Sequence, residues 1–484
     1  MNTSTSRSLR AGAALLLLPL ASISSVTNWA DRIPAAVKPV TRPLQGAKPD
    51  PQVLAQFGLY NNPTLQRLID TKGQQMNKVS DRPGDYGFTI VDSPVINAFA
   101  TPAGHVYFTR GIMAHFNSEA QFAGVLGHEL GHITARHGQS QQRRSTAAGI
   151  GLLLGSIIAP KIAQSIGGIA QQGLGVLFLK YGRDDERESD QLGVKYSTKI
   201  GYDASQMADF FQTLQRNQSA SGGSNIPTFL SSHPNSADRY TTVKKLAAQA
   251  KQNAGGRQLN VGRDSYLRMI EGLPYGEDPR QGYVEGGAFY HPDLKFQMPV
   301  PSGWKSQNSP SQFQMGEPNG KAIIVLVPAS GNSLDEAAQS LAKSVGLQSA
   351  NAQRTTINGF PAVVMQGEQA GQQDQPGAAV LAHVIQDGGN YYGIVGLTAP
   401  ATFSTYANTF SGVAQGFARL TDANKLNRRS QRIHIKTATG TQTLDQALTA
   451  AGVPANRHEE LAILNGMQRT DRLGKGMLYK VVGN

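Results

Sequence analysis

Apolar and polar positions along the chain change their spacing several times, and each change predicts an element. Asn62 and Pro63 have the residue types of a helix N-cap and first turn. Short β-branched and aromatic runs predict strands at 88–90, 95–96 and 106–109. The apolar positions after Pro63 recur at helical spacing: Leu65, Leu68, Ile69 and Met76.

A stronger helical pattern begins at Ser118, with Gln121 three residues later as in a capping box, and Gly138 is expected to end it. A glycine-rich apolar stretch over 147–179 follows, which fits buried helices or a surface that touches a membrane or a partner. From Tyr181 the pattern is polar and helical, 216–226 reads as a loop, and a further helix runs toward Lys251. The apolar side of the helix after Ser118 comprises Phe122, Val125, Leu126, Leu130 and Ile133.

Two smaller units follow this region. Strands at 322–327, 362–365, 378–385 and 391–397, with helices at 334–345 and 403–420, predict an α+β domain with a mostly antiparallel sheet over 283–424. Residues 430–484 show a strand–helix–helix–strand order. We therefore expect a multidomain chain: an N-terminal arm (26–54), a mainly helical α+β domain (55–272) and these two units.

The first residues resemble an export signal. Arg7 and Arg10 precede an apolar run from Ala11 to Ala21, which is shorter than the roughly 20 residues that span a bilayer. We expect 1–25 to be a signal peptide and the protein to lie in the periplasm of a Gram-negative bacterium, associated with the outer membrane or the cell wall.

Charge and cysteine content narrow the chemistry. The formal net charge is +12 and no nucleic-acid motif is visible, so we expect no nucleic-acid partner. A generally solvated basic surface, or one that meets the anionic envelope, fits better. The sequence contains no cysteine, so any zinc must be bound by histidine and carboxylate side chains.

The string Gly127-His128-Glu129-Leu130-Gly131-His132 carries the clearest chemistry. Residues four apart share one face of a helix, so His128 and His132 can bind one ion from the same side. Glu129 can then reach a water on that ion. This HExxH pattern is typical of metalloproteases.

A catalytic zinc site needs a third protein ligand. In one class this is a histidine ten residues after the first, but that position is Gly138, and His137 is one residue out of register. The other class uses a glutamate from a later helix, for which Glu186 is the candidate. Asp190, one turn further on, can accept a hydrogen bond from a ligand histidine. Taken alone, this acidic run also fits a solvated helix face.

These residues lie within longer matching segments: NAFATPAG at 97–104, TRG at 109–111, VLGHELGHITARHG at 125–138, the ExxxD element of Glu186 and Asp190, and the HPxxxxR element of His233 and Arg239. Over residues 55–250 the sequence resembles the exported zinc metallopeptidases that include BepA, HtpX and the CAAX prenyl endopeptidases. Ser189 departs from the alanine usual in that family.

The resemblance implies a gluzincin-type endopeptidase with one zinc ion per chain, held by His128, His132 and Glu186, with Glu129 as general base. It implies that His233 lies near the metal, where it can fill the open position as a regulatory fourth ligand. Arg239 is expected to contact substrate or the tetrahedral intermediate. The strand at 106–109 is expected to line the cleft as an edge strand and to pair with extended substrate.

The implied substrates are polypeptides, namely misfolded or stalled envelope proteins. The alternative is an envelope chaperone or wall-tethered scaffold with a dormant zinc site. The unit at 283–424 weakly resembles small α+β domains of the PsbP type. Residues 430–484 resemble a LysM module, with Thr439 to Leu444 at the turn, so this unit is expected either to bind peptidoglycan or to act as a structural cap.

Overall fold

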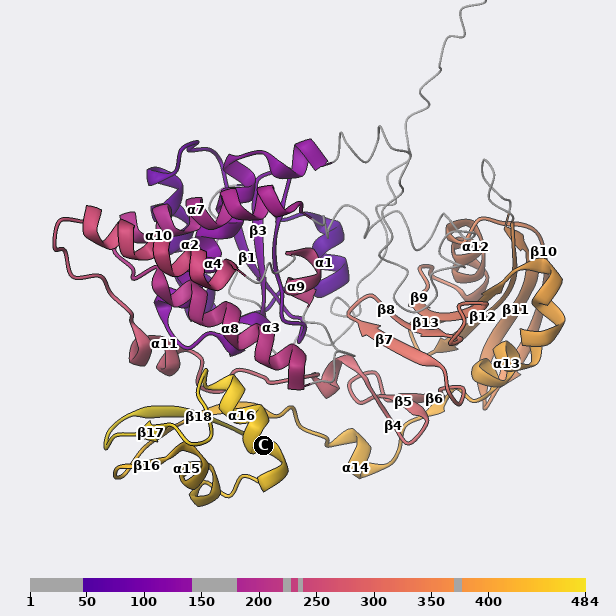
Figure 1. The fold of residues 1–484 in the computed structure, drawn as a ribbon. Helices are drawn as coiled ribbons and strands as arrows, with labels where there is room; N and C mark the ends of the chain where they lie inside the picture. The colour runs from indigo at the N-terminus through magenta and orange to yellow at the C-terminus, as the bar shows by residue number, and fades with distance from the viewer. Residues whose placement is uncertain (1–46, 142–180, 221–227, 234–237, 370–376) are drawn as a thin grey trace, which may run out of the picture.

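The computed structural model describes residues 47–141, 181–220, 228–233, 238–369 and 377–484. In Figure 1 the helix-rich N-terminal region lies beside a sheet-rich region drawn in orange. The yellow C-terminal residues lie against the helix-rich region and not against the sheet. The helix-rich region and the C-terminal residues are therefore in contact.

A three-stranded sheet forms one side of the N-terminal region. It comprises β1 (Gly87–Val91), β2 (Ala98–Thr101) and β3 (His105–Thr109), in the order β1-β3-β2. The strand predicted at 106–109 is therefore present, but the expectation that it is an edge strand is wrong. It pairs in parallel with β1 and antiparallel with β2, so β2 provides the edge on the side of the HExxH helix.

Local sequence explains where the helices begin. Asn62 accepts hydrogen bonds from the Thr64 and Leu65 amides, and Ser118 accepts one from the Gln121 amide, as the capping patterns predict. The helices of this region are α1 (Pro51–Phe57), α2 (Pro63–Val79), α3 (Arg110–His115), α4 (Glu119–Thr134), α7 (Arg183–Lys199), α8 (Ser205–Ala220), α9 (Thr228–Ser232), α10 (Arg239–Asn253) and α11 (Arg263–Met269).

Two predicted helix ends in this region are wrong. Helix α4 ends at Thr134 and not at Gly138, because Arg136 adopts a left-handed conformation with φ of 61°. Helix α8 continues to Ala220 through positions predicted to be loop. Arg216 on that helix donates a hydrogen bond to the Met467 carbonyl, a tertiary contact that sequence periodicity does not reveal.

The middle region contains the predicted antiparallel sheet. Its seven strands follow the order β10-β11-β12-β13-β9-β8-β7, with α12 packed on one face and α13 on the other. The helix predicted at 403–420 ends at Gln415, and Ala418–Arg419 forms a short strand, β14, beside β6. The bounds are β4 (Tyr283–Glu285), β5 (Ala288–His291), β6 (Phe296–Pro299), β7 (Lys305–Ser309), β8 (Gln312–Gly316), β9 (Ala322–Pro328), α12 (Leu334–Ser344), β10 (Leu347–Ile357), β11 (Phe360–Gln369), β12 (Ala378–Asp387), β13 (Asn390–Thr398), α13 (Phe403–Gln415) and α14 (Ala423–Leu426).

The C-terminal unit has the predicted strand–helix–helix–strand order. Strands β15 (Arg432–Thr437) and β18 (Leu478–Gly483) pair antiparallel around α15 (Leu444–Ala450) and α16 (His458–Leu464), with a short pair formed by β16 (Gln442–Thr443) and β17 (Arg472–Leu473). One buried apolar cluster includes residues of this unit and of the helix-rich region. The Ile433 amide also donates to the Leu273 carbonyl at 2.9 Å. The two units therefore share a core.

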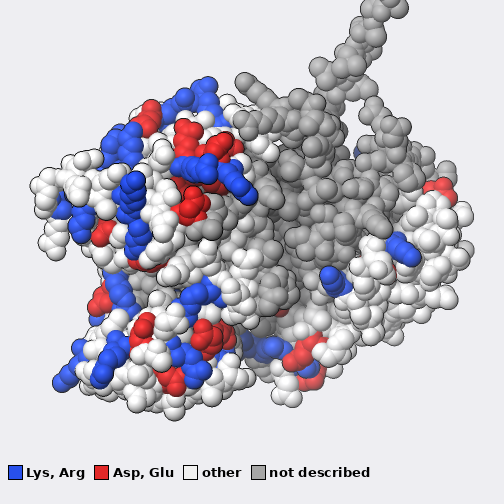
Figure 2. All heavy atoms as spheres, viewed as in Figure 1, with Lys and Arg blue, Asp and Glu red and all other residues white. Residues whose placement is uncertain are grey.

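Surface charge is mixed on the face shown in Figure 2. Blue and red side chains alternate over the helix-rich and C-terminal units, while the sheet-rich unit shows few charges. The described residues on this face form no single basic stripe. None of the helices in the described ranges is both long enough and apolar enough to cross a bilayer. The apolar stretch at 147–179 lies outside the described residues.

Candidate metal centre

Helices α4 and α7 cross at glycines, which brings the predicted residues together. A Cβ atom added to Gly193 would lie 3.0 Å from the His128 amide nitrogen, and one added to Gly127 would lie 2.9 Å from the Gly193 carbonyl oxygen. Such a close approach of two helix backbones needs residues without side chains. It places the first turns of α7 opposite His128 and His132.

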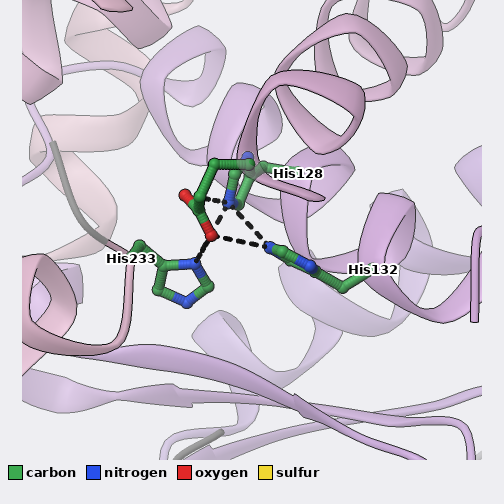
Figure 3. Close-up of side chains that lie close together, drawn as sticks. His128, His132 and His233 are labelled. Carbon is green, nitrogen blue, oxygen red and sulfur yellow. Dashed lines mark hydrogen bonds and ion pairs between the residues drawn. The ribbon is translucent and has the colours of Figure 1, made fainter. Parts of the chain in front are cut away.

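Four buried side chains converge beside this crossing. Ligand atoms of His128, His132, Glu186 and His233 all lie within 4.8 Å of one another. Figure 3 shows the three labelled imidazoles pointing toward a common point. The two histidines of the HExxH pattern, the distant glutamate and the later histidine are thus brought to one place.

The distances resemble the edges of a small tetrahedron. His128 Nε2 lies 3.1 Å from His132 Nε2 and 3.3 Å from His233 Nδ1. Glu186 Oε1 lies 2.9 Å from His233 Nδ1 and 3.4 Å from His132 Nε2. Tetrahedral zinc with bonds of about 2.0–2.1 Å separates its ligand atoms by about 3.3 Å. The spacing therefore fits one ion of that size.

The outer contacts of the imidazoles support the same fit. His128 Nδ1 lies 3.0 Å from Asp190 Oδ1, so this carboxylate is the group toward which the ring can direct an Nδ1–H. The inner Nε2 atom of His128 then carries a lone pair. It faces another imidazole nitrogen, His132 Nε2, within 3.1 Å in a buried site. Two buried nitrogen lone pairs facing each other without a partner are unfavourable, and a cation between them would remove that cost.

Asp190 and Arg239 hold this side of the site. Arg239 Nε and Nη2 donate to the two oxygens of Asp190 at 2.8 and 2.7 Å, and Arg239 Nη1 lies 3.0 Å from Glu186 Oε2. Burial would raise the pKa of Asp190, but Arg239 and His128 outweigh it and hold that pKa below its usual value. Arg239 therefore contacts acidic residues of α7, where the family resemblance led us to expect a contact with substrate.

Glu129 is the remaining acidic group. Burial raises its pKa, and neither of its carboxylate oxygens has a hydrogen-bond partner among the described residues. His233 Nε2 lies 3.5 Å from Glu129 Oε1. For Glu186, burial also acts to raise the pKa, but His233, His132 and His128 outweigh it, so its pKa lies well below the usual value. Burial thus acts in the same direction on both carboxylates, and only at Glu186 is it outweighed by the neighbouring imidazoles.

Two aromatic residues were missed by the sequence reasoning. Tyr181 stacks on His132 with ring centroids 3.7 Å apart, and Phe229 stacks on His233 at 4.6 Å. A cavity of about 20 Å³, enough for a water molecule, lies between Tyr181, His132 and the β2 residues Ala100 and Thr101. Aromatic side chains in such segments look like ordinary core residues, so no sequence signal distinguished them.

A buried site with three imidazoles, a carboxylate ligand and an adjacent unpartnered carboxylate is of the kind used by metal-dependent hydrolases. Comparisons with known proteins agree with this class. Residues 61–247 match the model of Peptidase family M48. The predicted resemblance to these peptidases, and to BepA, is confirmed.

Individual relatives each match 33–40% of the chain. A "Putative beta-barrel assembly-enhancing protease" of Vibrio cholerae is 31% identical over 40% of this chain and 41% of its own length. "Mitochondrial metalloendopeptidase OMA1" of Arabidopsis thaliana is 31% identical over 33% of this chain and 30% of its own length. "Metalloprotease YcaL" of Escherichia coli is 28% identical over 36% of this chain and 66% of its own length. The chain thus spans less than half the length of the first two relatives.

Among solved structures, cyanobacterial PsbP of Synechocystis aligns with 28% of this chain and 98% of its own, at 16% identity and a TM-score of 0.24. A likeness at that score carries no argument about the chain.

Proposed function

We propose that this protein is a zinc-dependent endopeptidase of the cell envelope, of gluzincin type, which hydrolyses misfolded or stalled envelope proteins. The observation that carries the proposal is the convergence of His128, His132 and Glu186 within the spacing of one ion. The relatives named as proteases, one of them as a beta-barrel assembly-enhancing protease, support the reaction and the envelope location. One ion per chain fits the single cluster found in the described residues.

The roles of the residues follow from their contacts. Bound zinc would acidify a water and polarise the scissile carbonyl. His128, His132 and Glu186 would hold the ion, with Asp190 orienting His128. Glu129, whose pKa is raised by burial, would take the proton from the water and deliver it to the leaving amine. Arg239 would keep Asp190 ionised and would hold both Asp190 and Glu186 in place. The edge of β2, beside the small cavity, would pair with extended substrate.

The test separates zinc binding from turnover. In Glu129→Gln the shape is kept and the base is lost, so we expect a full complement of zinc and a loss of at least about 100-fold in cleavage of unfolded casein. Chelation should abolish cleavage by the unmodified protein. Full activity of Glu129→Gln would overturn the proposal.

A second candidate is supported by His233. Its Nδ1 atom stands at the fourth corner of the cluster, 2.9 Å from Glu186 Oε1, where a catalytic site would keep a water. This arrangement favours a dormant zinc site, either in a regulated protease or in an envelope chaperone or wall-tethered scaffold. Cleavage of casein by His233→Ala, but not by the unmodified protein, would identify a regulated protease. Inactivity of both proteins with zinc bound would favour the scaffold.

The remaining assignments extend this proposal to the whole chain. We propose a signal peptide at 1–25, an arm at 26–54, the peptidase domain at 55–272, an α+β accessory domain at 283–424 and a LysM-like unit at 430–484. The location would be the periplasm, near the outer membrane or the cell wall. Sedimentation with purified peptidoglycan tests whether the last unit binds glycan or serves only as a cap.

A further inference from the structure

The outer face of His132 contacts a residue that the sequence patterns left without a role. His132 Nδ1 lies 3.0 Å from His137 Nδ1, and both rings are buried. His137 follows the end of α4, where the left-handed Arg136 turns the chain back toward the helix. His132 therefore contacts another imidazole, where His128 contacts the carboxylate of Asp190.

The proposed zinc site assigns a proton to one nitrogen of each ring. His132 Nε2 faces the converging ligand atoms and would give its lone pair to the ion, so the neutral ring would carry its proton on Nδ1. That N–H donates to His137 Nδ1, which must then be an acceptor. The proton of His137 consequently lies on Nε2, which is 3.3 Å from Glu188 Oε2 and 3.9 Å from Asp185 Oδ1. Each hydrogen bond therefore points away from the cluster: His132 donates to His137, and His137 donates to Glu188 on α7.

A ligand imidazole gains basicity and a fixed orientation when its other nitrogen donates to an acceptor. We propose that His137 is a positioning residue for the metal centre: its Nδ1 accepts a hydrogen bond from the Nδ1–H of His132, and its Nε2–H donates to the carboxylate of Glu188. This inference rests on the proposed zinc site, but it does not require that the protein cleave peptides.

The chain also contains a hydroxyl beside this contact. Ser189 Oγ lies 3.3 Å from His137 Nδ1, the nitrogen that already faces His132 at 3.0 Å. Because the shorter contact satisfies the acceptor, Ser189 adds little to it. The substitution Ser189→Ala therefore removes a neighbour of His137 without breaking the relay, and it provides a matched control.

The test is zinc affinity, measured on the full chain by competition with a chromophoric chelator. His137→Ala should weaken zinc binding by about 10- to 100-fold, as loss of such a partner typically does. His137→Gln, whose side-chain carbonyl can accept the same proton, should recover part of the loss. Ser189→Ala should change the affinity less than about threefold. Glu188→Gln, at a side chain that is 60% exposed, should weaken binding by a smaller factor than His137→Ala without a folding defect.

The melting temperature of the zinc-free protein separates positioning from simple packing. We expect it to be nearly equal in the unmodified protein, in His137→Gln and in Glu188→Gln. Wild-type zinc affinity in His137→Ala would overturn the inference. So would a loss that His137→Gln does not recover and that is matched by a lower melting temperature without zinc. If the variants change zinc affinity as expected but the protein never cleaves casein, the inference about His137 is supported and the proposed function is contradicted.

Discussion

At the scale of single residues, Arg239 shows how much of the site depends on buried charge. Arg239 is almost fully buried and pairs with Asp190 through two hydrogen bonds. Its guanidinium group also lies over the ring of Phe211, with the guanidinium carbon 4.1 Å from the ring centroid. A buried pair of this kind stabilises only while both members are present, because the survivor would be left as an uncompensated charge.

We therefore expect Arg239→Met to lower the free energy of unfolding by about 3–5 kcal/mol. The control is Lys195→Met, which removes a shorter ion pair, with Asp81 at 2.6 Å, between half-exposed side chains. That change should cost about 1 kcal/mol or less. Urea unfolding of both variants measures the difference, and equal effects would contradict the argument.

A second residue-scale prediction concerns acid. His383 on β12 is buried in the middle region, and burial lowers the pKa of its imidazole from 6.5 to about 4. The unfolded chain takes up a proton near pH 6.5 and the folded one does not until about pH 4. Stability is therefore lost as the pH falls from 6.5 to 4, by about 2 kcal/mol at pH 5 from this group.

Replacing His383 by Leu should remove that part of the acid sensitivity. We expect the difference between the free energies of unfolding at pH 7 and pH 5 to shrink by about 2 kcal/mol in His383→Leu. Urea titrations at the two pH values measure it. The same decrease in both proteins would show that His383 does not contribute.

At the scale of elements, the crossing of α4 and α7 determines the site. The crossing depends on Gly127 and Gly193, whose backbones touch, and it brings Glu186 to the two histidines of α4. A methyl group at this contact must push the helices apart by some tenths of an ångström, and overpacking of this kind costs about 1–3 kcal/mol.

Gly193→Ala should accordingly lower both stability and zinc affinity. The matched control is Gly412→Ala in α13, where an added Cβ meets nothing within 4 Å and where alanine favours the helix by about 0.5–1 kcal/mol. Thermal unfolding with and without zinc measures both effects. Unchanged zinc affinity in Gly193→Ala would mean that the crossing does not set the ligand geometry.

At the scale of the whole molecule, the C-terminal unit is joined to the helix-rich region through Lys480. This side chain is fully buried, and its Nζ donates to the carbonyl oxygens of Ala114, Phe116 and Leu464 at 2.9, 2.7 and 3.0 Å. Three acceptors match the three N–H bonds of an ammonium group. Burial lowers the pKa of Lys480 because it penalises the charged form of the side chain. The three carbonyl oxygens offset this penalty by accepting hydrogen bonds from the amino group.

We expect Lys480→Met to lower the free energy of unfolding by about 2–5 kcal/mol, because buried carbonyls of two units lose their donor. Lys475→Met, at an exposed position of the same unit, should have little effect. Hydrogen exchange of the amides near Phe116 and Leu464 should rise in the first variant only. Unchanged exchange there would indicate that the units are held together by their apolar core alone.

The sequence predicted most elements because their signals are local. The caps at Asn62 and Ser118, the strands of the middle sheet and the order of the last unit all follow from side chains within a few residues of one another. The misplaced ends of α4 and α8 depend on a left-handed Arg136 and on a contact between Arg216 and Met467. Neither feature changes the spacing of apolar residues along the chain, so the sequence pattern does not show it.

The spacing of His128 and His132, and the choice of Glu186 and His233 as candidates, were available from the sequence because motif residues keep fixed distances along a helix or within a family. Only the tertiary structure decided what surrounds them. The glycine crossing, the stacked Tyr181, the relay through His137 and the anchor at Lys480 all join residues far apart in the chain or turned by an unusual backbone. Such contacts arise from packing, which no local pattern specifies.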